Sequence, residues 1–188
     1  MVGDDDVENK VRAVEHLWAG WRSAYVQGGD AHGGDDERSV PDIADGKTLF
    51  EAILHSGYPD RDTLILWRGE RVFAMLNAFP YTSGHLMVLP VRAVEQLTEL
   101  DEAEHAELWH GVRLATQAVE AAYAPHGINV GANLGRGAGA GIPDHLHVHV
   151  LPRWDGDTNF TTAIANTRVM PESLAATWER LHAAWPST

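Results

Sequence analysis

The sequence predicts an α+β fold, in which helices pack on one face of an antiparallel sheet. Two apolar segments, residues 63–67 and 71–77, are separated by a short turn that contains glycine, which is typical of a β-hairpin. A single long stretch at residues 101–124 then carries apolar residues at helical spacing, so strands and helices do not alternate along the chain. Hydrophobic residues make up 44% of the 188 residues, which is enough for one globular domain with a core.

The N-terminal part is expected to contain two helices joined by a polar loop. Residues 7–26 have apolar side chains at mixed three- and four-residue spacing, which predicts a helix. Residues 27–46 hold five glycines and six acidic residues but few large apolar ones, so they are expected to form a surface loop. Residues 47–57 are expected to form a short helix with one apolar side.

The remaining elements follow from short apolar runs and their breakers. Residues 85–90 are a third expected strand, and Pro125 is expected to end the long helix. The fourth and fifth strands are expected at residues 128–134 and 145–151, and a C-terminal helix at residues 171–185. We therefore divide the chain into an N-terminal helix with an acidic Gly-rich loop, a central domain, and a C-terminal extension with a helix, at residues 1–46, 47–160 and 161–188.

Composition excludes several classes of function. The formal charge is 14 − 27 = −13, which opposes general binding to nucleic acid but still allows a local pocket for a small anion. The chain contains no cysteine, so disulfides, thiolate zinc sites and a cysteine nucleophile are excluded. Its acidic start lacks the apolar region of a secretory signal, and no apolar run approaches the ~18 residues of a membrane span. A soluble cytoplasmic protein without a membrane partner is expected.

Three histidines alternate with apolar residues in the last expected strand. Successive side chains of a strand point to opposite faces, so His145, His147 and His149 are expected to share one face. Their rings would lie about 6.6 Å apart along the strand, given a rise of ~3.3 Å per residue. Burying an imidazole costs desolvation, so three aligned histidines indicate a functional site rather than simple packing.

The histidine pattern alone allows two kinds of chemistry. Three imidazoles could bind a divalent metal such as zinc, or one could act as a nucleophile with help from the others. The glycine-rich loop of residues 133–143, directly before the histidines, favours the second interpretation. Glycines let backbone N–H groups turn inward and let a ligand approach closely, which suits a phosphate.

The sequence resembles the histidine triad (HIT) superfamily in two of its segments. Residues 145–151 fit its signature, His-φ-His-φ-His-φ-φ with φ apolar, and a second similar stretch covers residues 72–90. The resemblance extends over roughly residues 63–154. It implies a five-stranded antiparallel sheet with two main helices, here extended by N- and C-terminal helices. It also implies a homodimer whose sheets join across the pair, and a nucleotidyl hydrolase or transferase that binds nucleotides.

The resemblance also implies a role for each site residue. His147 would attack the α-phosphorus and form a nucleotidyl–imidazole adduct, His149 would contact the phosphate oxygens and assist the leaving group, and His145 would support His147. Asn77 would reach the ribose, while His85 matches another family position near the site. The phosphates would be held by Asn133 and by the backbone of Gly139, Ala140, Gly141 and Ile142. No metal and no cofactor are implied in the protein itself, although Mg²⁺ could accompany a polyphosphate substrate.

Departures from the family pattern indicate a branch of the superfamily. The region that carries a Cys-x-x-Cys zinc site in many relatives corresponds to residues 47–50, which contain no cysteine. Gly141 stands where some hydrolases of the family have glutamine. The run Arg153–Phe160 resembles bacterial proteins of the diadenosine tetraphosphate phosphorylase type.

The leading interpretation is therefore a phosphorylase or hydrolase of dinucleoside polyphosphates. Whether water or inorganic phosphate accepts the nucleotidyl group stays open at this point. Two alternatives also stay open. One is a nucleotide-binding HIT protein that hydrolyses nucleoside phosphoramidates or other nucleotides, and the other is a metalloenzyme with histidine ligands.

Overall fold

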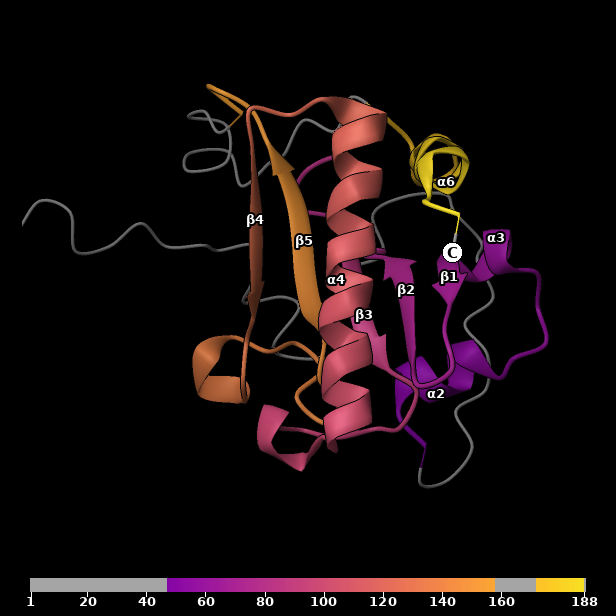
Figure 1. Cartoon of the computed structure of the whole chain (residues 1–188), viewed down its shortest axis with the longest axis vertical. Coiled ribbons are helices and arrows are strands. Elements are labelled where there is room, and N and C mark those ends of the chain that lie inside the picture. Colours follow the sequence, from indigo (N-terminus) through magenta and orange to yellow (C-terminus); the bar gives the residue numbers. More distant parts are fainter. Residues whose placement is uncertain (1–46, 158–171, 188) are drawn as a thin grey trace, which may run out of the picture. The chain divides into compact units, whose positions relative to one another are not determined.

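A computed structural model describes residues 47–157 and 172–187 (Figure 1). The expected helix at residues 7–26, the acidic loop at 27–46 and the proposed boundary at 160/161 lie outside the described residues. The described part contains one five-stranded antiparallel sheet with strand order β1-β2-β3-β5-β4, together with helices, which confirms the predicted α+β class. Its strands are β1 (Ile65–Arg68), β2 (Val72–Leu76), β3 (Leu86–Pro90), β4 (Gly127–Ala132) and β5 (Val148–Arg153).

Within residues 47–157 and 172–187, four α-helices and two short 3₁₀ turns connect or cover these strands. The helices are α2 (Leu49–Leu54), α3 (Asp60–Thr63), α4 (Glu102–Tyr123) and α6 (Leu174–Ala184), and the 3₁₀ turns are η3 (Leu97–Glu99) and η4 (Arg136–Ala138). The two larger helices that pack on the sheet, α4 and α6, lie close to the positions expected from apolar spacing. No helix in the two described ranges is long and apolar enough to cross a membrane.

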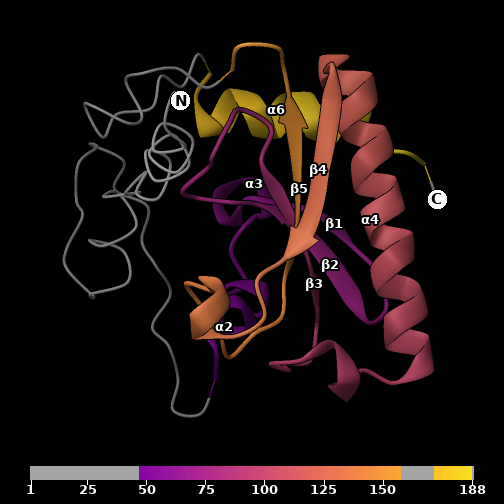
Figure 2. The ribbon, with the colours of Figure 1, turned by 90° about the vertical axis from the view of Figure 1, so that its left-hand side faces the viewer.

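Helix α4 covers one face of the sheet (Figures 1 and 2). It starts at a capping box: the Asp101 carboxylate accepts from the N–H of Glu104, and the Glu104 carboxylate accepts from the N–H of Asp101. Arg92 donates to the buried Glu104 carboxylate and neutralises it. The apolar side of α4 packs on inward-facing strand residues, in a core that includes Leu108, Ala115, Val119, Val88, Val148 and Val150.

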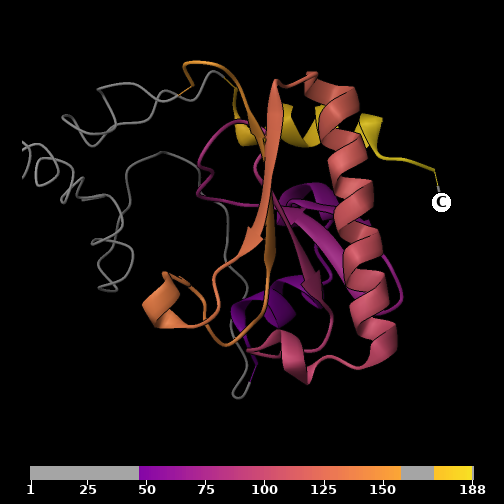
Figure 3. The same cartoon turned by 60° about the vertical axis from the view of Figure 1, so that its left-hand side comes forward.

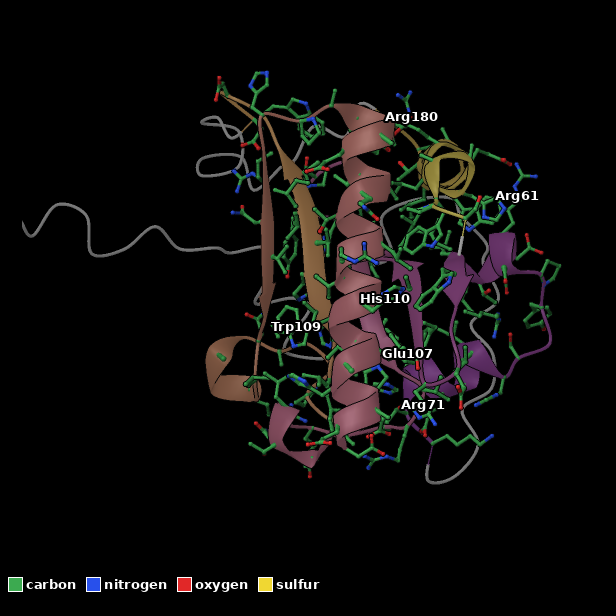
Figure 4. The ribbon with its side chains drawn as sticks, viewed as in Figure 1. Arg61, Arg71, Glu107, Trp109, His110 and Arg180 are labelled. Atoms are coloured by element: carbon green, nitrogen blue, oxygen red, sulfur yellow. The ribbon has the colours of Figure 1, made fainter. Side chains whose placement is uncertain are left out.

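Glu107 of α4 anchors the first hairpin. Its carboxylate accepts from the backbone N–H groups of Glu70 and Arg71, at 2.7 Å and 3.1 Å, and Figure 4 shows it near the Arg71 side chain at the same end of the helix. Gly69 lies in this turn, and a Cβ there would come within 2.2 Å of the Glu107 carboxylate. The glycine noted in the sequence is therefore needed for close approach of the hairpin to α4.

The opposite face of the sheet carries a second, smaller core. Helix α2 contributes Phe50 and Leu54 to it, and the strands contribute Ile65, Phe73, Met75, Met87 and Leu89. Figure 2 shows α2 and α4 on opposite sides of the strands. Met87 lies opposite His149 in the β3–β5 register, so the histidine face of β5 belongs to this second side.

Several expected boundaries were wrong in detail. Strand β1 starts at Ile65 rather than at residue 63, because Asp60–Thr63 form α3, and α6 starts at Leu174 rather than at residue 171, with Ser173 as its cap. Strand β5 starts at Val148 rather than at residue 145, because the preceding segment makes one backbone hydrogen bond, from Leu146 N–H to the Val94 carbonyl, instead of a ladder. Strand β4 covers 127–132 rather than 128–134. The helix expected at 47–57 is only six residues long, because Gly57 adopts a positive φ of 76° and a separate turn, α3, follows Pro59.

Candidate active site

His145 is fully buried, with both ring nitrogens hydrogen-bonded. Its Nε2 lies 2.8 Å from the carbonyl oxygen of Pro90, which can only accept, so Nε2 carries the hydrogen. Its Nδ1 lies 2.7 Å from the Thr48 hydroxyl, which must then donate. Burial lowers the pKa of His145, and this effect exceeds the opposing influence of the Pro90 carbonyl and Glu51. The ring is therefore neutral near pH 7.

His147 is oriented by the backbone of the residue two positions before it. Its Nδ1 donates to the carbonyl oxygen of His145 at 2.8 Å, which leaves the lone pair on Nε2. Burial lowers the pKa of His147, so the ring is neutral at physiological pH. The Phe50 ring lies 5.7 Å from it, centroid to centroid. A neutral imidazole with a fixed tautomer and its lone pair on Nε2 is prepared for nucleophilic attack.

His149 receives its orientation through a chain of hydrogen bonds from the β2–β3 loop. The N–H of Tyr81 donates to Nδ1 of His85 at 3.0 Å, so Nδ1 accepts and Nε2 carries the hydrogen of this ring. That atom lies 3.0 Å from Nδ1 of His149 and donates to it. The hydrogen of His149 is then on Nε2, which is the form that can donate to a phosphate oxygen.

The three histidines come together as the sequence predicted, although two of them precede the strand. The rings of His147 and His149 lie 4.9 Å apart in an edge-to-face arrangement, and Phe50 packs against His145 at 5.4 Å. Leu146 points to the other face, into the α4 core. The period-two alternation therefore extends beyond the hydrogen-bonded strand.

Asn77 lies at the end of β2, beside this chain of histidines. Its Oδ1 accepts from the N–H of Phe79 at 2.9 Å, so it caps the turn after β2. Its Nδ2 lies 3.5 Å from Nε2 of His85. The side chain is half-buried and next to the site, and its expected contact with ribose stays a prediction.

The glycine-rich loop adopts a compact shape between β4 and the histidines. Gly139 has a φ of 89°, and the N–H groups of Ala138 and Ala140 both donate to the carbonyl oxygen of Gly135. Asn133 is half-buried and Gly141 is exposed, while Ile142 packs against the core that contains Phe50. The loop therefore reaches the histidine side of the sheet, and phosphate binding by its backbone stays a prediction.

Sequence reasoning missed Thr48, Phe50 and Tyr81 as contacts of the histidines. A local signal existed for Thr48, because Thr48 and Glu51 form the Thr-x-x-Glu pattern of a capping box. Its contact with a histidine 97 positions later had no local signal. Among the described residues, no group of three or more His, Cys, Asp or Glu side chains is placed to hold a metal ion.

The fold and the three buried histidines define a class of protein. The model of the HIT domain family matches residues 59–156, which is about half of the chain, and the chain belongs to this family.

Comparisons with individual proteins agree with this class. The chain is 45% identical over 172 residues to an AP-4-A phosphorylase of Mycobacterium tuberculosis (strain CDC 1551 / Oshkosh), covering 92% of this chain and 85% of that protein. It is 34% identical over 93 residues, half of each chain, to an asymmetrical bis(5'-nucleosyl)-tetraphosphatase of Schizosaccharomyces pombe. A crystal structure of a hypothetical histidine triad nucleotide-binding protein from Sulfolobus tokodaii has a TM-score of 0.60 at 26% identity, covering 73% of this chain and 91% of that one.

Proposed function

We propose that this enzyme is a dinucleoside polyphosphate phosphorylase, which transfers a nucleotidyl group from its substrate to inorganic phosphate through an adduct on His147. The observation that carries the proposal is the fixed tautomer of His147, which places its lone pair on Nε2. This histidine is the middle one of the triad in a chain that belongs to the HIT family. The likeness to an AP-4-A phosphorylase extends over 92% of the chain, beyond the catalytic domain, and favours phosphate as the acceptor.

The first half of the reaction uses His147 and His149. The lone pair on Nε2 of His147 attacks the α-phosphorus, a P–N bond forms, and the P–O bond to the leaving polyphosphate breaks. The Nε2–H of His149 donates to the oxygen that departs or to a phosphate oxygen, where negative charge develops. His145 stays neutral and holds the carbonyl that orients His147.

The second half returns the enzyme to its starting state. An oxygen of inorganic phosphate attacks the same phosphorus, a new P–O bond forms, and the P–N bond to His147 breaks. With diadenosine tetraphosphate the first half releases ATP and the second releases ADP. In the proposal Asn77 holds the ribose, and Asn133 with residues 139–142 holds the phosphates.

A product assay tests the proposal directly. Diadenosine tetraphosphate is incubated with the enzyme, with and without inorganic phosphate, and the nucleotides are separated by ion-exchange chromatography. We expect ADP, and more than one ATP per active site, only when phosphate is present. When phosphate is left out, we expect an acid-labile adenylyl adduct and the release of at most one ATP per active site. AMP and ATP without any need for phosphate would show a hydrolase instead, which the Schizosaccharomyces pombe relative makes the second candidate. The absence of any adduct on the protein would overturn the covalent mechanism.

The hydrogen bonding of the histidines disfavours the metalloenzyme alternative. Both ring nitrogens of His145 are hydrogen-bonded to protein atoms, and Nδ1 of His147 and of His149 is engaged as well. A three-histidine metal site would require His145 to give up one of these bonds. The expectations of no cofactor, no nucleic-acid partner and a cytoplasmic location stay predictions.

We also propose that the protein forms a homodimer through the edge of β4. Within the described residues β4 pairs only with β5, and its segment carries neither a charged residue nor a proline. Val130 of β4 is 44% exposed, and Leu134, two residues beyond the end of the strand, is 39% exposed. At the opposite edge, Trp178 of α6 donates to the Ile65 carbonyl and covers β1. An open edge without charges is a template for pairing with a second strand.

A substitution at that edge tests the dimer. Val130→Lys places a charge on β4, and we expect the mass measured by light scattering after size exclusion to fall from that of a dimer to that of a monomer. Arg113→Lys, on the exposed side of α4, serves as the control and should keep the wild-type mass. A monomeric wild-type protein at micromolar concentration would refute the proposed assembly.

A further inference from the structure

Thr48 links the start of α2 to the histidine site. Its hydroxyl lies 2.7 Å from Nδ1 of His145, across 97 positions of sequence. Figures 2 and 3 both show α2 beside the loop that leads into β5. Thr48 is half-buried, and the family signature of residues 145–151 does not include it.

The direction of this hydrogen bond follows from the other side of the ring. The Pro90 carbonyl occupies Nε2 of His145 and requires the hydrogen there, so Nδ1 of the neutral ring can only accept. Thr48 must therefore supply a hydrogen. A second acceptor for the same hydroxyl, Oε2 of Glu51, lies farther away at 3.2 Å, so the shorter contact to His145 takes the single hydrogen.

The His145–Leu146 peptide carries the effect from Thr48 to the reacting atom. The carbonyl of this peptide accepts from Nδ1 of His147, and its N–H donates to the Val94 carbonyl at 2.6 Å. Because a peptide is planar, the His145 carbonyl and the Leu146 N–H move together, and both move with the His145 residue. The His145 side chain is held at both nitrogens, which limits how far this peptide can tilt.

We propose that Thr48 is a positioning residue for nucleotidyl transfer: its hydroxyl holds His145, and His145 presents the carbonyl that orients the attacking ring of His147. This inference rests on the proposed function, in which His147 is the nucleophile. Thr48 does not touch the reacting atoms. A displacement of about 1 Å at a reacting group can cost roughly 100-fold in rate, so loss of the anchor is expected to act on turnover.

Thr48 also caps α2, and the experiment must separate the two roles. Its hydroxyl accepts from the N–H of Glu51 at 3.3 Å, while the Glu51 carboxylate accepts from the N–H of Thr48 at 2.9 Å. Glu51→Ala removes one half of this capping box and leaves the Thr48 hydroxyl in place. Thr48→Val removes the hydroxyl from both roles, whereas Thr48→Ser keeps it in both.

The kinetic experiment compares these three variants with the wild type in single-turnover adduct formation from diadenosine tetraphosphate. We expect Thr48→Val to slow adduct formation about 10- to 100-fold with KM changed less than about threefold, and Thr48→Ser to retain most of the rate. Glu51→Ala and Thr48→Val should both lower Tm by about 2–4 °C, as the loss of a cap predicts. A rate for Thr48→Val within twofold of the wild type, or an equal slowing in Glu51→Ala, would overturn the positioning role.

A spectroscopic measurement on the free enzyme keeps this inference separate from the proposed reaction. The ¹⁵N shifts of His145 should show hydrogen on Nε2 and a hydrogen-bonded lone pair on Nδ1, and Thr48→Val should change the Nδ1 shift alone. Thr48→Asp keeps a capping acceptor but cannot donate, so the pKa of His145 should rise, given that Glu51, Asp144 and His147 are the other ionisable groups acting on it. If the wild type formed no adduct but these shifts appeared, the proposed function would fail while the anchoring contact stood. Unchanged His145 shifts in Thr48→Val would refute the contact itself.

Discussion

The two faces of the segment around β5 carry opposite chemistry within a few residues. On one face Leu146, Val148 and Val150 join the α4 core, where each side chain needs only neighbours of suitable shape. On the other face His145, His147 and His149 are equally buried, and each needs a hydrogen-bond partner of defined direction. Substitutions on the apolar face should therefore change stability, while those on the histidine face should change the reaction.

The histidine face depends on partners from other segments, whereas the apolar face depends on local pattern. Pro90 lies in β3, Thr48 lies at the start of α2, and His85 lies in the β2–β3 loop. Pro90 fixes the hydrogen of His145 on Nε2, and His85 fixes that of His149 on Nε2. The His145 carbonyl, held by these contacts, leaves His147 with a lone pair on Nε2, and this asymmetry between His147 and His149 is what a nucleophile and a donor require.

The largest effect is expected from His147→Ala. Removing the proposed nucleophile should lower turnover of diadenosine tetraphosphate by at least about 1,000-fold, because in the proposed mechanism only His147 forms the adduct. His110→Ala, which removes an exposed histidine from the outer side of α4 (Figure 4), is the matched control and should keep wild-type turnover. Turnover by His147→Ala at the level of the control would contradict the distinction between the two faces.

A substitution under α4 should have the opposite signature. Leu108 is fully buried in the core beneath α4, and Leu108→Ala should lower the free energy of unfolding by about 2–5 kcal/mol. The activity per folded molecule should stay within about twofold, because no catalytic ring contacts this side chain. Urea denaturation and active-site titration measure the two quantities. A large loss of turnover in the folded fraction would show that the faces are not independent.

His85→Phe should affect the reaction without changing His147, the proposed nucleophile. His85 is buried, and its donation to His149 fixes which nitrogen of His149 carries hydrogen. Phenylalanine fills a similar space but cannot donate, so we expect turnover to fall by roughly 100-fold, the lower end of what a positioned proton donor contributes. A substrate with a more acidic leaving group needs less proton donation, so His85→Phe should form the adduct from it with a smaller loss of rate. Equal slowing with both substrates would argue against a role in leaving-group departure.

The smallest effect is a dependence of stability on pH. Burial lowers the pKa of both His145 and His147 in the folded protein below the ordinary value of 6.5. The unfolded chain then binds more protons below about pH 6.5, so stability should fall with acidification, by at most about 1.4 kcal/mol per group for each pH unit. Urea unfolding at pH 7.5, 6.5 and 5.5 measures it, with His147→Gln expected to show a shallower fall. The same free energy at pH 7.5 and 5.5 would contradict two buried neutral rings.

The fold and the reactive residue types were largely readable from the sequence, because both depend on local pattern. The period of the apolar residues located α4 to within one or two residues, and alternation placed the three histidines on one face. Two features of the site could not be predicted from the sequence. The segment of His145 and His147 is extended without being paired, and side-chain alternation is the same in both cases. The partners Thr48 and Pro90 come from distant segments, so only the folded chain brings them to His145.

The dependence of His145 on α2 has a consequence for how the protein moves. A helix of six residues is too short to persist alone in water, so α2 is ordered by its contacts with the rest of the domain. Local opening of α2 would remove the Thr48 anchor while leaving the sheet and α4 intact. Amide hydrogen exchange in Leu49–Leu54 should therefore report the fraction of time that the site is assembled, and a nucleotide that requires the assembled site should slow that exchange in proportion to its affinity.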